Sequence, residues 1–247
     1  MPESGEFQCA ISWAENSAGR RSPQTLYMSR KGQTKPARSS QEGRSRLGHA
    51  SEKASRTSFT RAELRSFTGA TLPDLIADGV RLLFTGINPG LRSVAVQGHF
   101  APRGNRFYPA LLRAGITDHL IDASAGLSAS DRDYLLGRGV GITSLVARAT
   151  ASASELGPAE LAEGARALAE RVRRYQPRVV AILGVSAYRI AFGSPRAALG
   201  RQPGSLHGAE LWVVPNPSGR NAHASADTLA AAYREVALAA AIDLSPT

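Results

Sequence analysis

The chain is poor in the residues on which many site chemistries depend. Its 247 residues include a single cysteine, Cys9, which excludes an internal disulfide framework, a cysteine-ligated iron–sulfur cluster and a four-cysteine zinc site. The five histidines show no close ligand spacing: His49, His99, His119, His207 and His223. We therefore expect no metal and no cofactor.

Long apolar runs and lysine are also scarce. No apolar stretch is long enough to span a bilayer, and the first thirty residues lack the apolar core of a signal peptide, so we expect a cytoplasmic protein. The only lysines, Lys31, Lys35 and Lys53, all precede residue 58. A core lysine is therefore not available as a Schiff-base nucleophile, which excludes lyase chemistry of that type.

Positive charge, by contrast, is abundant. The net charge is +10 and the pI about 10.6, which favours a polyanionic partner such as nucleic acid. Residues 1–70 hold 12 Lys and Arg against 6 Asp and Glu, and residues 71–247 hold 18 against 14. We expect residues 1–58 to form a basic, disordered tail and residues 59–247 to form the folded domain.

Short apolar runs alternate with helical patterns from residue 60 onward. The patterns predict strands at 80–85, 139–146, 179–184 and 211–214, and helices at 60–64, 107–114, 161–175, 186–192 and 226–242. Residues 91–106 are expected to form a loop. Strands that alternate with helices indicate an α/β sandwich around a mainly parallel sheet.

Two predicted strands each end in an Asn-Pro loop. The first loop, Gly86-Ile87-Asn88-Pro89-Gly90, cannot be helical, because Pro89 lacks a backbone donor and restricts Asn88. Its glycines allow the backbone to approach a ligand closely. No Asp or Glu occurs between Asp78 and Asp118, so the loop holds a carboxamide and no carboxylate. The alternative is a tight turn that Asn88 merely caps.

Two further stretches combine polar, basic and aromatic residues. Residues 98–108 place Phe100 within a polar loop beside arginines, which suits the stacking of a planar base. We expect the neighbouring His99 to be an exposed structural histidine. The late loop, residues 216–225, carries small polar groups that can donate to phosphate, with Arg220 placed to enter a duplex. An ordinary strand-to-helix loop is the alternative.

Five motifs in order resemble the mismatch-specific uracil-DNA glycosylase and thymine-DNA glycosylase family. They are Gly-Ile-Asn-Pro-Gly-Leu at 86–91, Asn-Arg-Phe at 105–107, the strands at 140–146 and 181–184, and Asn-Pro-Ser-Gly at 216–219. The resemblance covers roughly residues 72–240. It implies a three-layer α/β/α sandwich of the uracil-DNA glycosylase type, and a monomer that acts on double-stranded DNA with a mismatched or damaged base.

The resemblance also implies roles for residues. Asn88 would position the water that hydrolyses the N-glycosidic bond of a flipped uracil mispaired with guanine, leaving an abasic site without lyase activity. The base would be bound by Gly86, Ile87, Ser93, Phe100 and Asn105. DNA would be held by Asn216, Pro217, Ser218, Gly219, Arg220 and Asn221.

The sequence departs from the family at the wedge, where Arg220 replaces the leucine of bacterial relatives. Three other readings stay open. One is a glycosylase of the same fold that prefers other deaminated or alkylated bases. Another is a DNA-binding module without catalysis. A third is a nucleotide-binding protein using Gly137–Gly141, but that stretch precedes a strand instead of following one.

Overall fold

The computed structural model describes residues 58–219, 221 and 224–246. The expected basic tail, residues 1–58, lies outside the described residues except for Ser58. The described part begins with a short helix, α2 (Arg61–Arg65), which starts in a capping box between Thr60 and Glu63. The helix expected at this place is confirmed.

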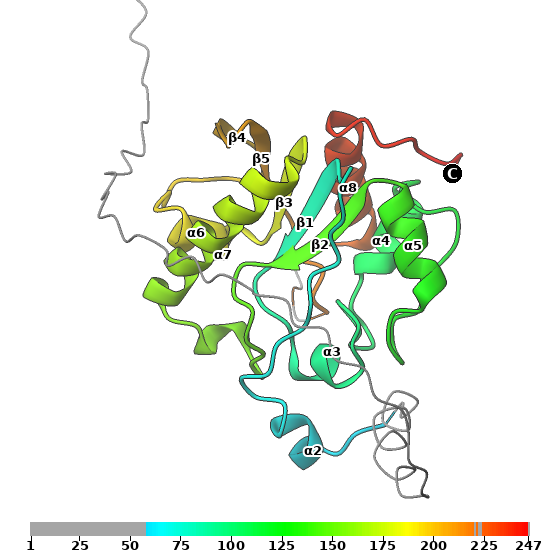
Figure 1. Cartoon of the computed structure of the whole chain (residues 1–247), viewed down its shortest axis with the longest axis vertical. Helices are drawn as coiled ribbons and strands as arrows, with labels where there is room; N and C mark the ends of the chain where they lie inside the picture. The colour runs from blue at the N-terminus through cyan, green and yellow to red at the C-terminus, as the bar shows by residue number, and fades with distance from the viewer. Residues whose placement is uncertain (1–57, 220, 222–223, 247) are drawn as a thin grey trace, which may run out of the picture. The chain divides into compact units, whose positions relative to one another are not determined.

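A five-stranded sheet lies at the centre of the domain (Figure 1). Its strands are β1 (Leu82–Gly86), β2 (Val140–Ser144), β3 (Val179–Leu183), β4 (Gly200–Leu206) and β5 (Ala209–Val214). The strand order is β2-β1-β3-β5-β4. All pairs are parallel except β4 with β5, which confirms a mainly parallel sheet.

Helices cover both faces of the sheet, as Figure 1 shows. Helices α6 (Pro158–Tyr175) and α7 (Val185–Ala191) lie on one side, and α4 (Phe107–Arg113), α5 (Ala129–Gly137) and α8 (Ala226–Ala239) lie on the other. Along β1, Leu83 packs into the core beneath α6 and α7, and Phe84 packs into the core beneath α4, α5 and α8, because neighbouring side chains of a strand point to opposite faces. The three-layer α/β/α sandwich is therefore confirmed.

Residues at or next to the ends of the covering helices determine where these helices begin and end. Pro158 begins α6, and Leu161, Leu168 and Val172 form its buried stripe. Helix α6 ends where Gln176 turns into the left-handed region at φ 47°. The Ser225 hydroxyl accepts a hydrogen bond from Thr228 N and starts α8.

Three short elements were not predicted: α3 (Leu91–Ala95), α5 and β4, and a 3-10 turn, η2 (Ala153–Glu155), lies between β2 and α6. Helix α5 buries only Leu135, so its sequence carries little helical periodicity. Strand β4 contains a proline and is mostly exposed. It forms because the turn at His207 and Gly208, both at positive φ, folds it back antiparallel onto β5.

Candidate active site

The carboxyl ends of β1, β3 and β5 lie along one edge of the sheet, because these neighbouring strands run parallel. The first loop leaves β1 after Gly86, and the late loop leaves β5 after Val214. In open α/β sheets this edge is where ligands bind.

The Asn88 carboxamide is held from one side. Its Nδ2 donates to Thr150 Oγ1 at 2.7 Å, to the Arg148 carbonyl at 3.1 Å and to the Pro89 carbonyl at 3.3 Å. Since two of these partners are carbonyl oxygens, the NH₂ group must face them. The Oδ1 oxygen is thereby turned to the other side, where it can accept a hydrogen bond from a water or a ligand.

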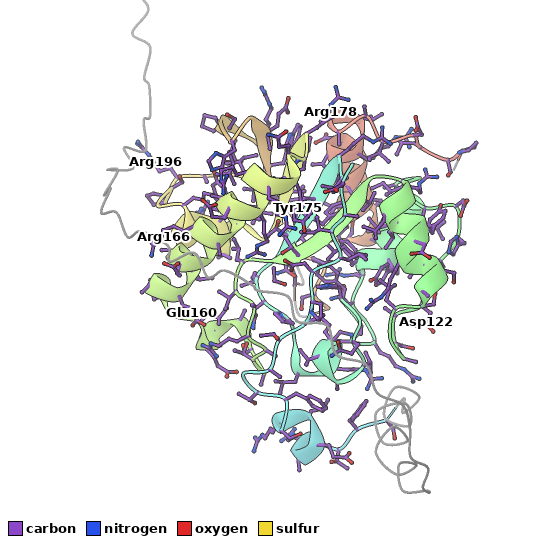
Figure 2. The ribbon with its side chains drawn as sticks, in the orientation of Figure 1. Asp122, Glu160, Arg166, Tyr175, Arg178 and Arg196 are labelled. Atoms are coloured by element: carbon purple, nitrogen blue, oxygen red, sulfur yellow. The ribbon has the colours of Figure 1, made fainter. Side chains whose placement is uncertain are left out.

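The partners of Asn88 are themselves braced. Thr150 is buried and donates to the Ser152 carbonyl at 2.8 Å. The Arg148 guanidinium donates from Nη2 to Glu160 Oε2 at 2.8 Å, and its hydrogen bonding lowers the pKa of the Glu160 carboxyl. Glu160 lies in the first turn of α6 (Figure 2). Sequence reasoning missed Thr150 and Arg148, because only the pairing of β1 with β2 brings residues 148–150 to the first loop.

Gly86 and Ser144 form a small floor beneath Phe100. The two residues are register partners at the ends of β1 and β2. A Cβ placed on Gly86 would lie 3.5 Å from Phe100 Cζ and 3.6 Å from Ser144 Oγ. Ser144 is 8% exposed, and its hydroxyl makes no hydrogen bond to any residue that the structure describes. A polar group in this position is a candidate ligand contact that the sequence reading did not single out.

Phe100 is turned over this floor by an unusual backbone. Its φ is 56°, in the left-handed region that non-glycine residues seldom occupy. The ring stacks on Phe107 of α4, with centroids 4.0 Å apart and an interplanar angle of 28°. One aromatic face is thereby supported by the core, and the half-buried ring is held at the edge of the sheet.

Two of the predicted base-binding residues support the loop that carries Phe100. Ser93 is 3% exposed in α3, and its carbonyl accepts from Gly98 N at 2.9 Å. Asn105 Oδ1 accepts from Phe107 N at 3.0 Å and so satisfies the first turn of α4. These bonds fix the path of the loop between them.

The expectation of an exposed histidine at position 99 is wrong. His99 is buried, and its Nε2 lies 2.9 Å from the Pro73 carbonyl. Burial lowers the pKa of the imidazole, because the charged form cannot be hydrated there. Tyr108 donates its hydroxyl to the His99 carbonyl at 3.0 Å. The polar residues around His99 indicated an exposed side chain, but the fold of the loop buries it.

The late loop is shaped by its own asparagines. Asn216 donates from Nδ2 to the Leu183 carbonyl at 3.3 Å and accepts at Oδ1 from Ser218 N at 2.9 Å. Asn221 Nδ2 donates to the Asn216 carbonyl at 2.9 Å. Pro217 is buried and Gly219 exposed. The proposed wedge, Arg220, lies outside the described residues.

Arg106 fastens the late loop to the loop of Phe100. Its backbone N–H donates to the Pro217 carbonyl at 3.0 Å. The guanidinium donates to the carbonyls of Ser218 at 2.9 Å, of Asn221 at 2.8 Å, and of Ala224. Sequence reasoning noticed the motif at 105–107 but assigned no role to this arginine.

Close backbone contacts bring the three loops together. A Cβ on Gly184, after β3, would lie 3.4 Å from Asn216 Nδ2 and 3.8 Å from Ile87 Cδ1, so the first and late loops meet there. A Cβ on Gly219 would lie 2.8 Å from the Gly104 carbonyl oxygen. The stretches expected to cooperate are therefore neighbours in the fold.

Other parts of the described surface offer less. A hollow of about 430 Å³ lies beside the last turn of α6. Most of its charged groups pair with each other, Arg171 with Asp74 and Arg173 with Glu170, and Arg174 lies over the Tyr175 ring. The described ranges contain no cluster of three or more His, Cys, Asp or Glu that could hold a metal ion. They also contain no helix long and apolar enough to cross a membrane.

Comparison with known proteins defines the class of this fold and site. The model of the uracil DNA glycosylase superfamily matches residues 73–239, which is more than half of the chain. The protein belongs to the uracil DNA glycosylase superfamily, and its sandwich is the fold of that superfamily.

One solved structure is similar to this chain. It is the solution NMR structure of a "putative Uracil DNA glycosylase" from Methanosarcina acetivorans, which is 16% identical. The match covers 67% of this chain and 96% of that one, with a TM-score of 0.46.

Proposed function

We propose that the protein is a monofunctional DNA glycosylase that excises uracil, mispaired with guanine, from double-stranded DNA and leaves an abasic site. Membership of the superfamily supports the glycosylase role. The observation that carries the rest is the one-sided anchoring of Asn88 beside Phe100 and the floor formed by Gly86 and Ser144. We further propose that the enzyme works as a cytoplasmic monomer without a cofactor.

The base must leave the helical stack before its sugar bond can be reached. A flipped uracil would stack on the half-buried ring of Phe100, whose other side rests on Phe107. Backbone N–H groups at Ile87 and Phe100 would donate to the carbonyls of the base. As the bond breaks, negative charge grows on the base, and donors already in place stabilise it without reorganisation.

Asn88 would hold the attacking water through Oδ1. A carboxamide is a poor base near neutral pH, and residues 79–117 supply no carboxylate. Water activation should therefore be weak, and the sugar must develop much of its positive charge before the water bonds. We expect a largely dissociative reaction with modest turnover.

The late loop would hold the DNA backbone beside the lesion. Ser218 and Gly219 would donate to phosphate, and Arg220 would fill the gap left by the flipped base. Asn216 and Asn221 would act mainly by shaping this loop, as their hydrogen bonds within it suggest. Ser93 and Asn105 would act in the same way on the loop of Phe100.

A wider range of bases is the second candidate. The Ser144 hydroxyl can both donate and accept a hydrogen bond, so it fits the edges of several nucleobases equally well. A glycosylase for deaminated purines or alkylated cytosines would need this kind of tolerance. Preference for mispaired guanine depends in addition on Arg220.

The deciding experiment is a panel of duplexes that differ in one base, scored for abasic sites under single-turnover conditions. Uracil opposite guanine, uracil opposite adenine, hypoxanthine and an alkylated cytosine would be compared with an undamaged duplex. We expect the fastest excision from the G·U duplex, with and without a chelator. Fastest excision from another duplex would support the second candidate, and no excision from any duplex would leave a DNA-binding module.

A further inference from the structure

The late loop turns its carbonyl oxygens inward. Five carbonyls accept hydrogen bonds from Arg106 or from the loop's own Asn221, namely those of Asn216, Pro217, Ser218, Asn221 and Ala224. In a trans peptide the N–H of the next residue points away from the carbonyl. The N–H of Gly219, an exposed residue, therefore points away from Arg106.

The charge at the centre of this arrangement has no carboxylate partner in the described part of the chain. The Arg106 guanidinium donates only to carbonyls, and its Nε is buried without a hydrogen bond. Arg113, about two turns away at the end of α4, pairs instead with Asp227 at 2.6 Å. The carbonyl dipoles stabilise this half-buried cation but leave its net positive charge in place. That charge therefore attracts an anion bound on the outer side of the loop.

We propose that Arg106 is a positioning residue for DNA. It sets the late loop so that the N–H of Gly219 faces away from the guanidinium, and it places beneath the loop a positive charge whose counter-ion is a phosphate of the bound strand. This inference rests on the proposed function, because it assumes that the loop grips DNA. It assigns part of the binding of the DNA backbone to Arg106, which lies outside the late loop in the sequence. In this proposal Arg106 does not contact the base.

The test is equilibrium binding of an undamaged duplex at several salt concentrations, together with single-turnover excision from a G·U duplex. Arg106→Met keeps the stem and removes the charge, and Arg106→Lys keeps the charge without the fork. Arg113→Met is the matched control, because Arg113 is an exposed arginine of α4 whose guanidinium pairs with Asp227 of α8 and not with the described residues of the late loop.

For Arg106→Met we expect the Kd to rise about tenfold, the usual scale for a charge-assisted hydrogen bond. The slope of log K against log salt should become shallower by about 0.9, the value for one phosphate contact. Arg106→Lys should keep the wild-type slope while binding more weakly, and Arg113→Met should change neither quantity.

A slope unchanged in Arg106→Met would overturn the proposal, because the arginine would then serve only the packing of the loop. If Arg106→Met does not fold, Arg106→Lys becomes the test. A changed slope of log K against log salt in Arg106→Lys would count against the inference. A Kd and an excision rate equal to those of the wild type would also count against it. Binding is measured without excision, so a wild-type protein that binds DNA but releases no base would refute the proposed function alone.

Discussion

The first loop and the late loop meet at the same edge of the sheet but are held by different means. The Asn88 loop is braced by neutral hydrogen bonds to Thr150 and to carbonyls. The late loop is braced by a cation, Arg106, and by backbone contact with Gly104. The first arrangement fixes one atom, Asn88 Oδ1, and the second presents a charged surface.

This difference suggests a division of work. A loop that positions one water needs orientation, and neutral hydrogen bonds supply it without perturbing the charge of the reacting atoms. A loop that holds a polyanion gains from a nearby positive charge. Changes in the first loop should therefore alter the rate of excision, and changes in the late loop should alter DNA binding.

Asn88→Ala gives the largest expected effect. Removal of one such positioning group typically costs about 100- to 1000-fold in rate, and the Kd for DNA should stay as in the wild type. Single-turnover excision from the G·U duplex and a binding titration measure the two quantities. Thermal melting serves as the control for folding, and a wild-type rate would remove Asn88 from the mechanism.

Gly219→Ala tests the late loop. The new Cβ would lie 2.8 Å from the Gly104 carbonyl oxygen, and because backbone cannot give way as a flexible side chain does, the two loops must move apart. We expect a Kd about tenfold higher, a loss of the order of one charge-assisted hydrogen bond, with a smaller change in the excision rate. Gly137→Ala on α5 is the control, since nothing lies within 4 Å of its Cβ position.

Thr150→Val tests the brace behind Asn88. Asn88 Nδ2 would lose one of three acceptors but keep its two carbonyl partners. The excision rate should fall roughly 2- to 10-fold, the net worth of one hydrogen bond, at unchanged Kd. The matched control is Thr68→Val, an exposed residue in the turn after α2. Weaker DNA binding at an unchanged rate would contradict the division between the loops.

A lower pH should give the smallest effect, a loss of folding stability through His99, the residue before Phe100. Burial lowers the pKa of His99 in the folded protein, while nearby Asp74 and the Pro73 carbonyl raise it and Arg132 lowers it. The unfolded chain therefore takes up the proton first, so stability is full above about pH 6.5 and falls as the pH drops below it.

Melting temperatures of wild type and His99→Gln across this pH range isolate the contribution of His99. The wild type should lose more stability than the variant on acidification. Equal losses in the two proteins would show that the histidine is protonated without cost in the folded state.

Much of the architecture could be predicted from the sequence because it depends on local patterns. The run at 179–183 is apolar throughout, as a strand buried on both faces requires. The stripe of Leu161, Leu168 and Val172 predicted α6. Strand β4 could not be predicted in this way, because it is stabilised only by pairing with β5.

The same distinction separates the parts of the candidate site. The sequence by itself determined the positions of Asn88 and of the two Asn-Pro loops, because proline and glycine restrict the chain wherever they occur. Only the tertiary structure decided which groups surround them. Thr150 is 62 residues from Asn88 and Arg106 is 112 residues from Ser218. No local pattern encodes such pairs, because they form only when parallel strands bring their ends to one edge of a sheet.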